Sequence, residues 1–219
     1  LILKRLTIFA DKARDLQSDA PGVTHAWPVR GSDELDALAL ALNDMVAESE
    51  RARNQIMHDV RTDSLTGLGN RKLLLEKLEH FLGLRKRQAQ PATLSIAVLL
   101  IDIDDFKIIN DSLGHQAGNY LLKEIAHSLQ VMVRASDVVT RLGGDEFALI
   151  FAADNDQLGV DQFAMRVQKT VSKPRTFNGS VLTVSCSIGI AIATESSDKD
   201  SLLRDADLAM YASKAAGKG

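Results

Sequence analysis

The feature that most restricts the fold of this chain is a nearly unbroken apolar run over residues 94–101, which ends at an acidic cluster containing Asp102, Asp104 and Asp105. A run rich in Val, Ile and Leu is typical of a strand that is buried on both faces. Such a strand needs a covering layer on each side, so the sequence predicts the centre of a layered domain. The carboxylates would then stand at one end of a buried sheet.

Helical and strand patterns alternate from about residue 63 onward, which predicts an α/β (α+β) domain with a central, mostly antiparallel sheet. Gly189 interrupts one β-branched segment, so we expect two strand segments or one bulged strand there. The expected strands cover residues 138–142, 146–151 and 181–193, and the expected helices cover residues 119–133, 157–172 and 201–211.

The first 62 residues have a different pattern, because apolar side chains recur there at heptad spacing. A helix is expected over residues 1–17, and a second from a cap at Ser32 to about Val60, with Glu34 and Asp36 in its first turn. One helix alone cannot bury so long an apolar stripe, so we expect a parallel helical pair that closes a four-helix bundle in a dimer. The alternative is a helix that packs on its own globular domain.

Composition excludes several classes of protein. The chain has 219 residues and a formal net charge of −3, which argues against a nucleic-acid binder while leaving room for a local phosphate pocket. The single cysteine, Cys186, excludes an internal disulfide and is typical of a reducing compartment. No apolar run approaches the roughly 18 residues of a membrane span. The chain starts without Met, and we expect it to be part of a longer protein.

Two carboxylates are the strongest candidates for a metal site. Asp102 closes the predicted central strand, and Asp145 follows two glycines in a tight hairpin. Adjacent antiparallel strands would bring the strand end and the hairpin tip together, and two carboxylates beside a backbone carbonyl suit Mg²⁺. Spacing alone equally allows a pair of solvated turn acids.

A phosphate site is a second candidate. The turn over residues 104–107 leads from a strand into a helix, whose first N–H groups favour anions. Lys214 and Lys218 lie four residues apart on the last predicted helix and so share one face. Two such lysines are also common on an ordinary solvated surface.

Five sequence blocks, in order over about 155 residues, resemble the GGDEF family of diguanylate cyclases. The most specific of them is Gly143-Gly144-Asp145-Glu146-Phe147. The other four blocks cover residues 63–71, 102–111, 113–118 and 207–214.

The resemblance implies a ferredoxin-like palm domain of the nucleotidyl-cyclase type over residues 63–219. Its activity would be the Mg²⁺-dependent condensation of two GTP molecules into cyclic di-GMP, with Mn²⁺ as an alternative ion. Asp102, Asp145 and the carbonyl of Ile103 would bind the metal ions, with Glu146 as a further catalytic residue. The residues implied in phosphate binding are Asp104, Asp105, Phe106, Lys107, Lys214 and Lys218. Each domain would hold one GTP, so the implied enzyme is a homodimer.

Guanine recognition is where this sequence departs from the family. Asn110 would contact one guanine edge, but Asn119 stands where the family usually has Asp. A carboxylate can accept from both guanine N–H groups, whereas an amide offers only one acceptor. An unmatched buried donor costs about 1–3 kcal/mol. Asn119 therefore predicts weaker GTP binding, a shift towards ATP, or binding without turnover, and the first is the outcome we favour.

An inhibitory product site is also implied by the resemblance. Arg134 and Asp137 have the spacing of the family's Arg-x-x-Asp motif, with Arg166 as a third member from a neighbouring helix. The expectation is feedback inhibition by cyclic di-GMP.

Residues 1–62 resemble a HAMP linker, chiefly from residue 31 to Met45. HAMP modules usually follow a transmembrane helix, which would make this chain the cytoplasmic portion of a bacterial inner-membrane protein, anchored by a segment that the sequence does not contain.

Two other functions compete with the cyclase. The domain could be a weak or inactive regulatory domain that binds GTP or cyclic di-GMP. It could also be an oligomerisation and relay module whose output lies in a further domain, such as a phosphodiesterase.

Overall fold

The computed structural model describes Trp27 and residues 34–87, 94–154 and 157–217. The helix expected over residues 1–17 and the predicted phosphate ligand Lys218 lie outside these described residues. The chain divides into two compact units, residues 1–58 and residues 59–219. None of the described helices is both long and apolar enough to cross a membrane.

Helix α2 (Glu34–Arg61) forms most of the described part of the first unit. Its first turn contains Glu34 and Asp36, as the sequence predicts. Trp27 is buried against Ala39 and the partly buried Leu42 and Val46 of this helix. Other apolar residues of the helix are not covered in this way: Leu38 is 47% exposed and Met45 is 61% exposed. The described residues of this chain therefore leave part of the predicted heptad stripe uncovered.

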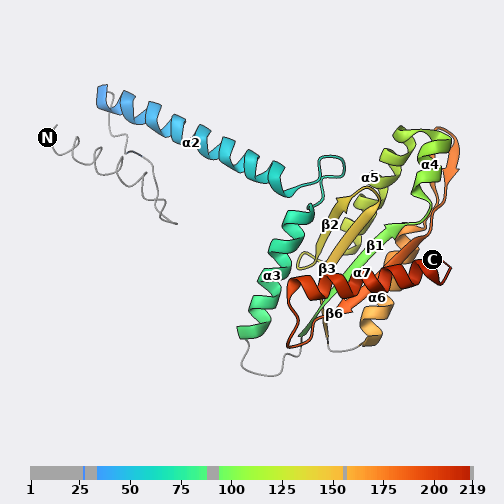
Figure 1. Ribbon diagram of the computed structural model, residues 1–219. Helices are drawn as coiled ribbons and strands as arrows, with labels where there is room; N and C mark the ends of the chain where they lie inside the picture. The colour runs from blue at the N-terminus through green and yellow to red at the C-terminus, as the bar shows by residue number, and fades with distance from the viewer. Residues whose placement is uncertain (1–26, 28–33, 88–93, 155–156, 218–219) are drawn as a thin grey trace. The chain divides into compact units, whose positions relative to one another are not determined.

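The second unit is built on a four-stranded sheet in the order β2-β3-β1-β6, with every neighbouring pair antiparallel (Figure 1). The prediction of a mostly antiparallel sheet is confirmed. The long strand β1 lies inside the sheet, between β3 and β6. The strands are β1 (Leu94–Ile103), β2 (Val138–Gly143), β3 (Glu146–Asp154) and β6 (Cys186–Ile192).

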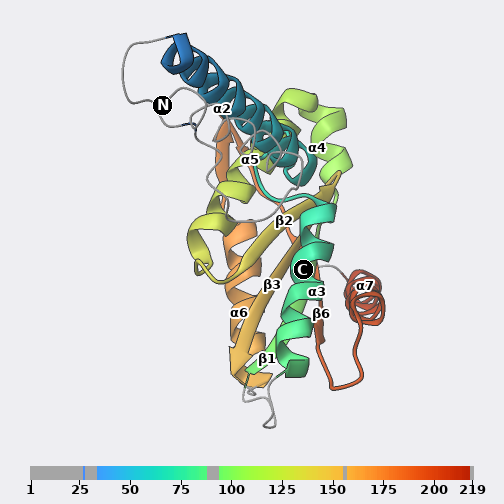
Figure 2. The same cartoon turned by 90° about the vertical axis from the view of Figure 1, so that its left-hand side faces the viewer.

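Helices cover both faces of this sheet, as the apolar run predicts (Figure 2). Leu99 and Ile101 of β1 belong to the core cluster formed with α5 and α6, whereas Val98 and Leu100 belong to the cluster formed with α3 and α7. The alternation follows from the two-residue period of a strand. The helices are α3 (Arg71–Arg87), α4 (Phe106–Leu113), α5 (His115–Met132), α6 (Gln157–Val171) and α7 (Lys199–Ala215).

Two boundaries differ from the sequence expectations for local reasons. Helix α5 begins at His115 rather than near residue 119, because Gly114, with φ of 82°, ends α4 and starts α5 within one residue. Helix α7 begins at Lys199 rather than near Ser201, because the Asp198 side chain accepts from the Ser201 N–H and caps the helix. The β-branched segment does form two strands, β5 (Ser180–Leu182) and β6, and β5 pairs with β4 (Arg175–Phe177).

Helix α7 lies very close to β6 because Gly189 has no side chain. A Cβ at this position would collide with the backbone of Ala206 and of Met210 on the helix. The close approach holds α7 against the sheet face that carries Leu100 and Asp102, since alternate residues of β1 share a face. This packing determines where the residues of the last helical turns meet the end of the sheet.

Candidate active site

The predicted carboxylates meet at one end of the sheet. Asp102 on β1 lies directly opposite Glu146 on β3, and the Ile103 N–H donates to the Asp145 carbonyl at 3.3 Å. The hairpin loop consists of Gly144 and Asp145, and Gly144 has a φ of 54°, which glycine adopts without steric cost. The sheet register therefore places the residues Asp102, Asp145 and Glu146, together with the strand-end residue Ile103, at the same end of the sheet.

A lysine from the last helix joins this cluster. The Lys214 ammonium lies 2.7 Å from an oxygen of Asp102, whose side chain is only 11% exposed. Asp102 and Lys214 come from elements more than 100 positions apart, and the docking of α7 on β6 brings them together. The second predicted lysine, Lys218, lies outside the described residues.

Burial and neighbouring negative charges raise the pKa of two of these carboxyls, Asp145 and Glu146. Burial raises the pKa of the Asp145 carboxyl, and the charge of Asp102 raises it further. The pKa of Glu146 is also raised, first by burial and then by the charges of Asp102 and Asp145, although Lys214 acts in the opposite direction. One lysine thus does not balance three acids, and a cation bound here would relieve the excess charge.

These residues fit a hard divalent cation. Carboxylate and carbonyl oxygens are the ligands that Mg²⁺ prefers, and this ion usually completes its shell with water and substrate phosphate. Among the described residues no group of three or more Asp, Glu, His or Cys side chains is arranged around a single ion position. Asp102, Asp145 and the Ile103 carbonyl would therefore hold the ion together with its phosphate ligand rather than enclose it.

The turn after β1 leaves its backbone N–H groups for the predicted contact with phosphate, while two of its side chains are buried. The Asp104 carboxylate is buried and accepts hydrogen bonds from Ser185 and Ser187, and the Phe106 side chain lies in the core. Asp105 has a left-handed backbone with φ of 55°, and α4 starts directly after it. Lys107 is exposed. This turn can meet a phosphate through the first N–H groups of α4 and through Lys107.

The two asparagines predicted to contact guanine lie on helices that pack together. Asn110 is on α4, and its side chain lies against Gly118 of α5, where an added Cβ would collide with the amide. The neighbouring Asn119 is exposed at the start of α5. The Asn110 amide is thus at the α4–α5 contact, and the exposed Asn119 follows Gly118 on α5, open to a ligand.

Sequence reasoning missed a tether that holds the hairpin. Arg141 donates from Nη1 to both oxygens of Asp63, at 2.9 and 3.0 Å. Its Nε and Nη2 donate to the Gly144 carbonyl at 3.1 and 2.6 Å. Burial acts to raise the pKa of Asp63, but hydrogen bonds from Thr66 and Arg141 outweigh it and the pKa is lowered. Asp63 stands inside one identified sequence block and Arg141 lies two positions before another, but nothing in those blocks indicates that they meet.

The predicted inhibitory site is only partly assembled. An Asp137 oxygen accepts from the backbone N–H of Arg134 at 2.9 Å, while the Arg134 side chain is exposed and has no recorded ion pair among the described residues. Both residues line a cavity of roughly 560 Å³ that Lys77 and His80 of α3 also line. Arg166 is not brought to them: it lies 5.3 Å from the centre of the Phe163 ring and lines a separate hollow on α6.

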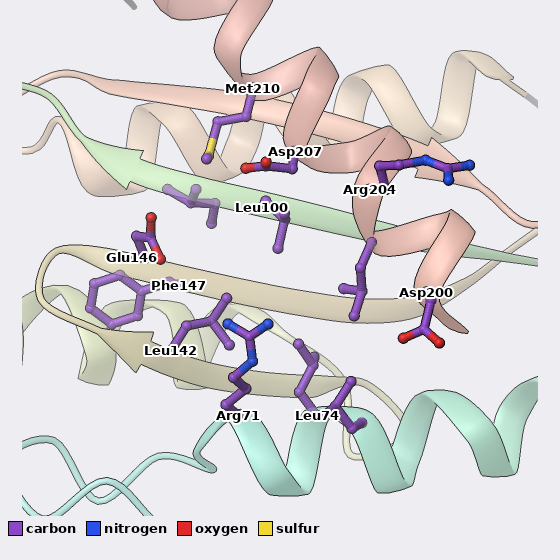
Figure 3. Close-up of a pocket in the computed structure, with 13 residues that line it drawn as sticks. Arg71, Leu74, Leu100, Leu142, Glu146, Phe147, Asp200, Arg204, Asp207 and Met210 are labelled. Carbon is purple, nitrogen blue, oxygen red and sulfur yellow. The ribbon is translucent and has the colours of Figure 1, made fainter. Parts of the chain in front are cut away.

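A further cavity, of roughly 480 Å³, adjoins the carboxylate cluster and was not predicted (Figure 3). It lies between α3, α7 and the sheet, and Glu146 stands at one end of it. Leucines, Phe147 and Met210 form its apolar wall, and its charged rim includes Arg71, Asp200, Arg204 and Asp207.

A buried thiol lies on the edge strand beside this site. Cys186 pairs with Ile103 in the β1–β6 register and is fully buried. Burial, with smaller contributions from Asp104 and Asp102, raises the pKa of this thiol to about 12. Cys186 is thus a residue of the hydrophobic core.

Comparison with known proteins matches residues 60–219 to the family described as "Diguanylate cyclase, GGDEF domain". The diguanylate cyclase TpbB of Pseudomonas aeruginosa is 35% identical over 210 residues, which cover 95% of this chain and 47% of TpbB. The bifunctional diguanylate cyclase/cyclic di-GMP phosphodiesterase MucR of the same species is 36% identical over 84% of this chain and 26% of MucR. The chain thus spans about half or less of the length of these relatives.

A crystal structure of the coiled coil and GGDEF domain of DgcB from Caulobacter crescentus, in complex with c-di-GMP, has a similar fold. Its TM-score is 0.72 at 29% identity, and the match covers 83% of this chain and 96% of the other.

Proposed function

The chain belongs to the GGDEF family, and on that premise we propose that it condenses two GTP molecules into cyclic di-GMP and releases two pyrophosphates. The observation that carries this proposal is the meeting of Asp102, Asp145, Glu146 and Lys214 at one end of the sheet. This is the set of charged groups that a metal-dependent phosphoryl transfer needs.

Asp102, Asp145 and the Ile103 carbonyl would hold Mg²⁺, or Mn²⁺, which when bound polarises the α-phosphate and activates the attacking hydroxyl. In the reaction the 3′ oxygen of one GTP forms a bond to the α-phosphorus of the other, and the bond to the departing pyrophosphate breaks. Glu146 is a candidate acceptor of the hydroxyl proton, because burial and Asp102 raise its pKa towards the working range of a general base. Lys214 and the first N–H groups of α4 would neutralise the charge of the phosphates.

Cyclisation requires two such sites facing each other, because each domain carries one set of these residues. We propose that a homodimer supplies them and that α2 contributes to it. The exposed Leu38 and Met45 on the heptad stripe support this assignment, since a second copy of the helix would cover them. Control by a HAMP-like module over residues 1–62, and an anchor in the inner membrane of a bacterium that leaves this part in the cytoplasm, belong to the same proposal.

Feedback by the product is the regulatory part of the proposal. The exposed Arg134 and the adjacent Asp137 border a cavity and offer a cation and a carboxylate to a dinucleotide. The DgcB structure, which is described as a complex with c-di-GMP, supports binding by a domain of this fold. Arg166 could join only if it left the Phe163 ring.

The test is incubation of the purified protein with Mg²⁺ and either GTP or ATP, followed by chromatography of the products. Cyclic di-GMP that disappears in Asp145→Ala is the expected result. An adenine-containing product would show that Asn119 has changed the choice of base. A folded dimer that binds GTP without forming any product would favour the alternative, a regulatory domain, which Asn119 also supports because it offers guanine one acceptor fewer than Asp.

A further inference from the structure

Asp104 is a buried carboxylate held by two serines of the neighbouring strand segment. It is 5% exposed, and it accepts from the Ser185 hydroxyl at 2.6 Å and from the Ser187 hydroxyl at 2.8 Å. Its own backbone N–H donates to the Ser185 carbonyl at 3.0 Å. No Lys or Arg is recorded as an ion-pair partner of Asp104 among the described residues, so the two hydroxyls are its recorded side-chain partners.

These three hydrogen bonds extend the pairing of β1 with β6 past its last regular pair. Ile103 lies opposite Cys186, and Asp102 lies opposite Ser187. Ser187 is therefore the cross-strand neighbour of one acid and the hydrogen-bond donor of the other. The peptide that carries the Ile103 carbonyl is thereby held between two anchored residues.

The backbone turns sharply just after this point. Asp105 adopts a φ of 55°, which an ordinary side chain adopts only at a steric cost, and its carbonyl accepts from the Ile108 N–H at 2.8 Å. Helix α4, with its first N–H groups, starts directly afterwards. A strained conformation of this kind persists only where its surroundings determine it, and the anchored Asp104 is the residue immediately before it.

We propose that Asp104, Ser185 and Ser187 form a seat that positions the Ile103 carbonyl and the first N–H groups of α4 for the metal ion and the phosphates. Asp104 is in this view a positioning residue rather than a ligand of the substrate. This role depends on the proposed cyclase function, but the seat itself is a property of the fold and can be measured without turnover.

Three variants separate the seat from its alternatives. Ser185→Ala combined with Ser187→Ala removes both hydroxyl donors and leaves the carboxylate. Asp104→Asn keeps both hydrogen bonds, because one serine hydroxyl can accept from the amide, but it removes the charge. Thr140→Val is the matched control: Thr140 is a fully buried hydroxyl on the edge strand β2, and it donates to the Ala148 carbonyl at 3.1 Å.

The first measurement is amide hydrogen exchange at Asp104 and Ile108, whose N–H groups report the two ends of the turn. We expect at least about tenfold faster exchange in the double serine variant, because it leaves the buried carboxylate without its donors. Asp104→Asn should stay within about twofold of the parent chain, and Thr140→Val should lower the melting temperature without changing these two amides. Unchanged exchange in a folded double variant would overturn the proposal, and Ser185→Ala alone serves if the double variant does not fold.

The second measurement is the affinity for a fluorescent GTP analogue with a non-hydrolysable α–β linkage, as a function of Mg²⁺ concentration. We expect about tenfold weaker Mg²⁺-dependent binding in the double variant and little change in Asp104→Asn. If Asp104→Asn instead weakens binding as strongly as Asp104→Ala while both retain slow exchange, Asp104 is a direct ligand and the proposal is wrong. A parent chain that forms no cyclic di-GMP would refute the cyclase, whereas the exchange data would still decide on the seat.

Discussion

The two charged sites of the GGDEF domain are built in opposite ways. At the sheet end, the charged side chains are partly buried, and Arg141 is held there by hydrogen bonds to Asp63 and to the Gly144 carbonyl. At the start of β2, the Arg134 side chain is exposed, and the adjacent Asp137 carboxylate accepts from the Arg134 N–H and the Ser136 hydroxyl of its own loop. The first arrangement suits chemistry that needs fixed geometry, and the second suits a ligand that has to arrive and leave.

Loss of the hairpin tether should have the largest effect on the rate of the proposed reaction. Arg141→Ala removes all four hydrogen bonds that join Asp63 and the Gly144 carbonyl to this side chain. We expect a fall in kcat of about 100-fold or more, because the loop that carries Asp145 would no longer be fixed. Steady-state assays of cyclic di-GMP formation would measure it. Arg141→Lys should not restore the rate, because an ammonium cannot serve both partners in one plane; full restoration would refute the tether.

Removal of the open arginine should instead leave the chemistry intact. Arg134→Ala should change the rate without product by less than about twofold, yet raise the cyclic di-GMP concentration for half-inhibition by about 30-fold, the loss expected for hydrogen bonds to a charged group. Inhibition curves at fixed GTP would show this, with Lys173→Ala as an exposed control on another loop. An equal loss of basal rate would mean that the two sites are not separate.

Substitution of Asn119 should strengthen the predicted contact with guanine. Asn119→Asp provides a second acceptor oxygen, and we expect the KM for GTP to fall by about tenfold while the KM for ATP does not fall. Asn110→Ala is the companion variant and should raise the KM for GTP. A KM for GTP unchanged by Asn119→Asp would show that the exposed Asn119 does not reach the base.

The smallest expected effect is on stability and its dependence on pH. The pKa of Glu146 is raised above its ordinary value of 4.5, so the folded state holds this proton more tightly and loses stability as pH rises through that range. Glu146→Gln should therefore raise the melting temperature at pH 7 by about 1–3 °C, and the gain should vanish below about pH 4.5. Thermal melts across pH would measure it.

Asp63 should behave in the opposite sense. Its pKa is lowered from 3.8, so its contribution to stability is present above that pH and is lost as pH falls further. Asp63→Asn should lower the melting temperature at pH 7 and converge with the parent chain in strong acid. If Asp63→Asn and Glu146→Gln shifted the melting temperature at pH 7 in the same direction and by the same amount, the two assignments would be contradicted: Asp63 as a partner in the tether, and Glu146 as part of an excess of negative charge.

The sequence predicted those parts of the site that depend on local patterns. The apolar run predicted β1, and the two glycines before Asp145 indicated the hairpin. Because antiparallel pairing brings a strand end and a hairpin tip together, the meeting of Asp102 and Asp145 could also be predicted. The sequence assigned Asp104 to phosphate binding and did not indicate that its carboxylate is buried. Its partners Ser185 and Ser187 lie more than 80 positions away, so no local pattern signals their hydrogen bonds. The tether from Arg141 to Asp63 was hidden for the same reason.

The buried Cys186 has a practical consequence for site-specific labelling of this protein through introduced cysteines. Maleimides and methanethiosulfonates react with the thiolate, and a fully buried thiol with a pKa of about 12 presents almost none of it at neutral pH. It is also the single cysteine in the sequence. The natural chain therefore already serves as a silent background for spin labels or fluorophores. One cysteine introduced at Leu40, which is exposed and lies off the heptad stripe, and one at exposed Tyr211 would report distances between the copies of the proposed dimer without any change to the core.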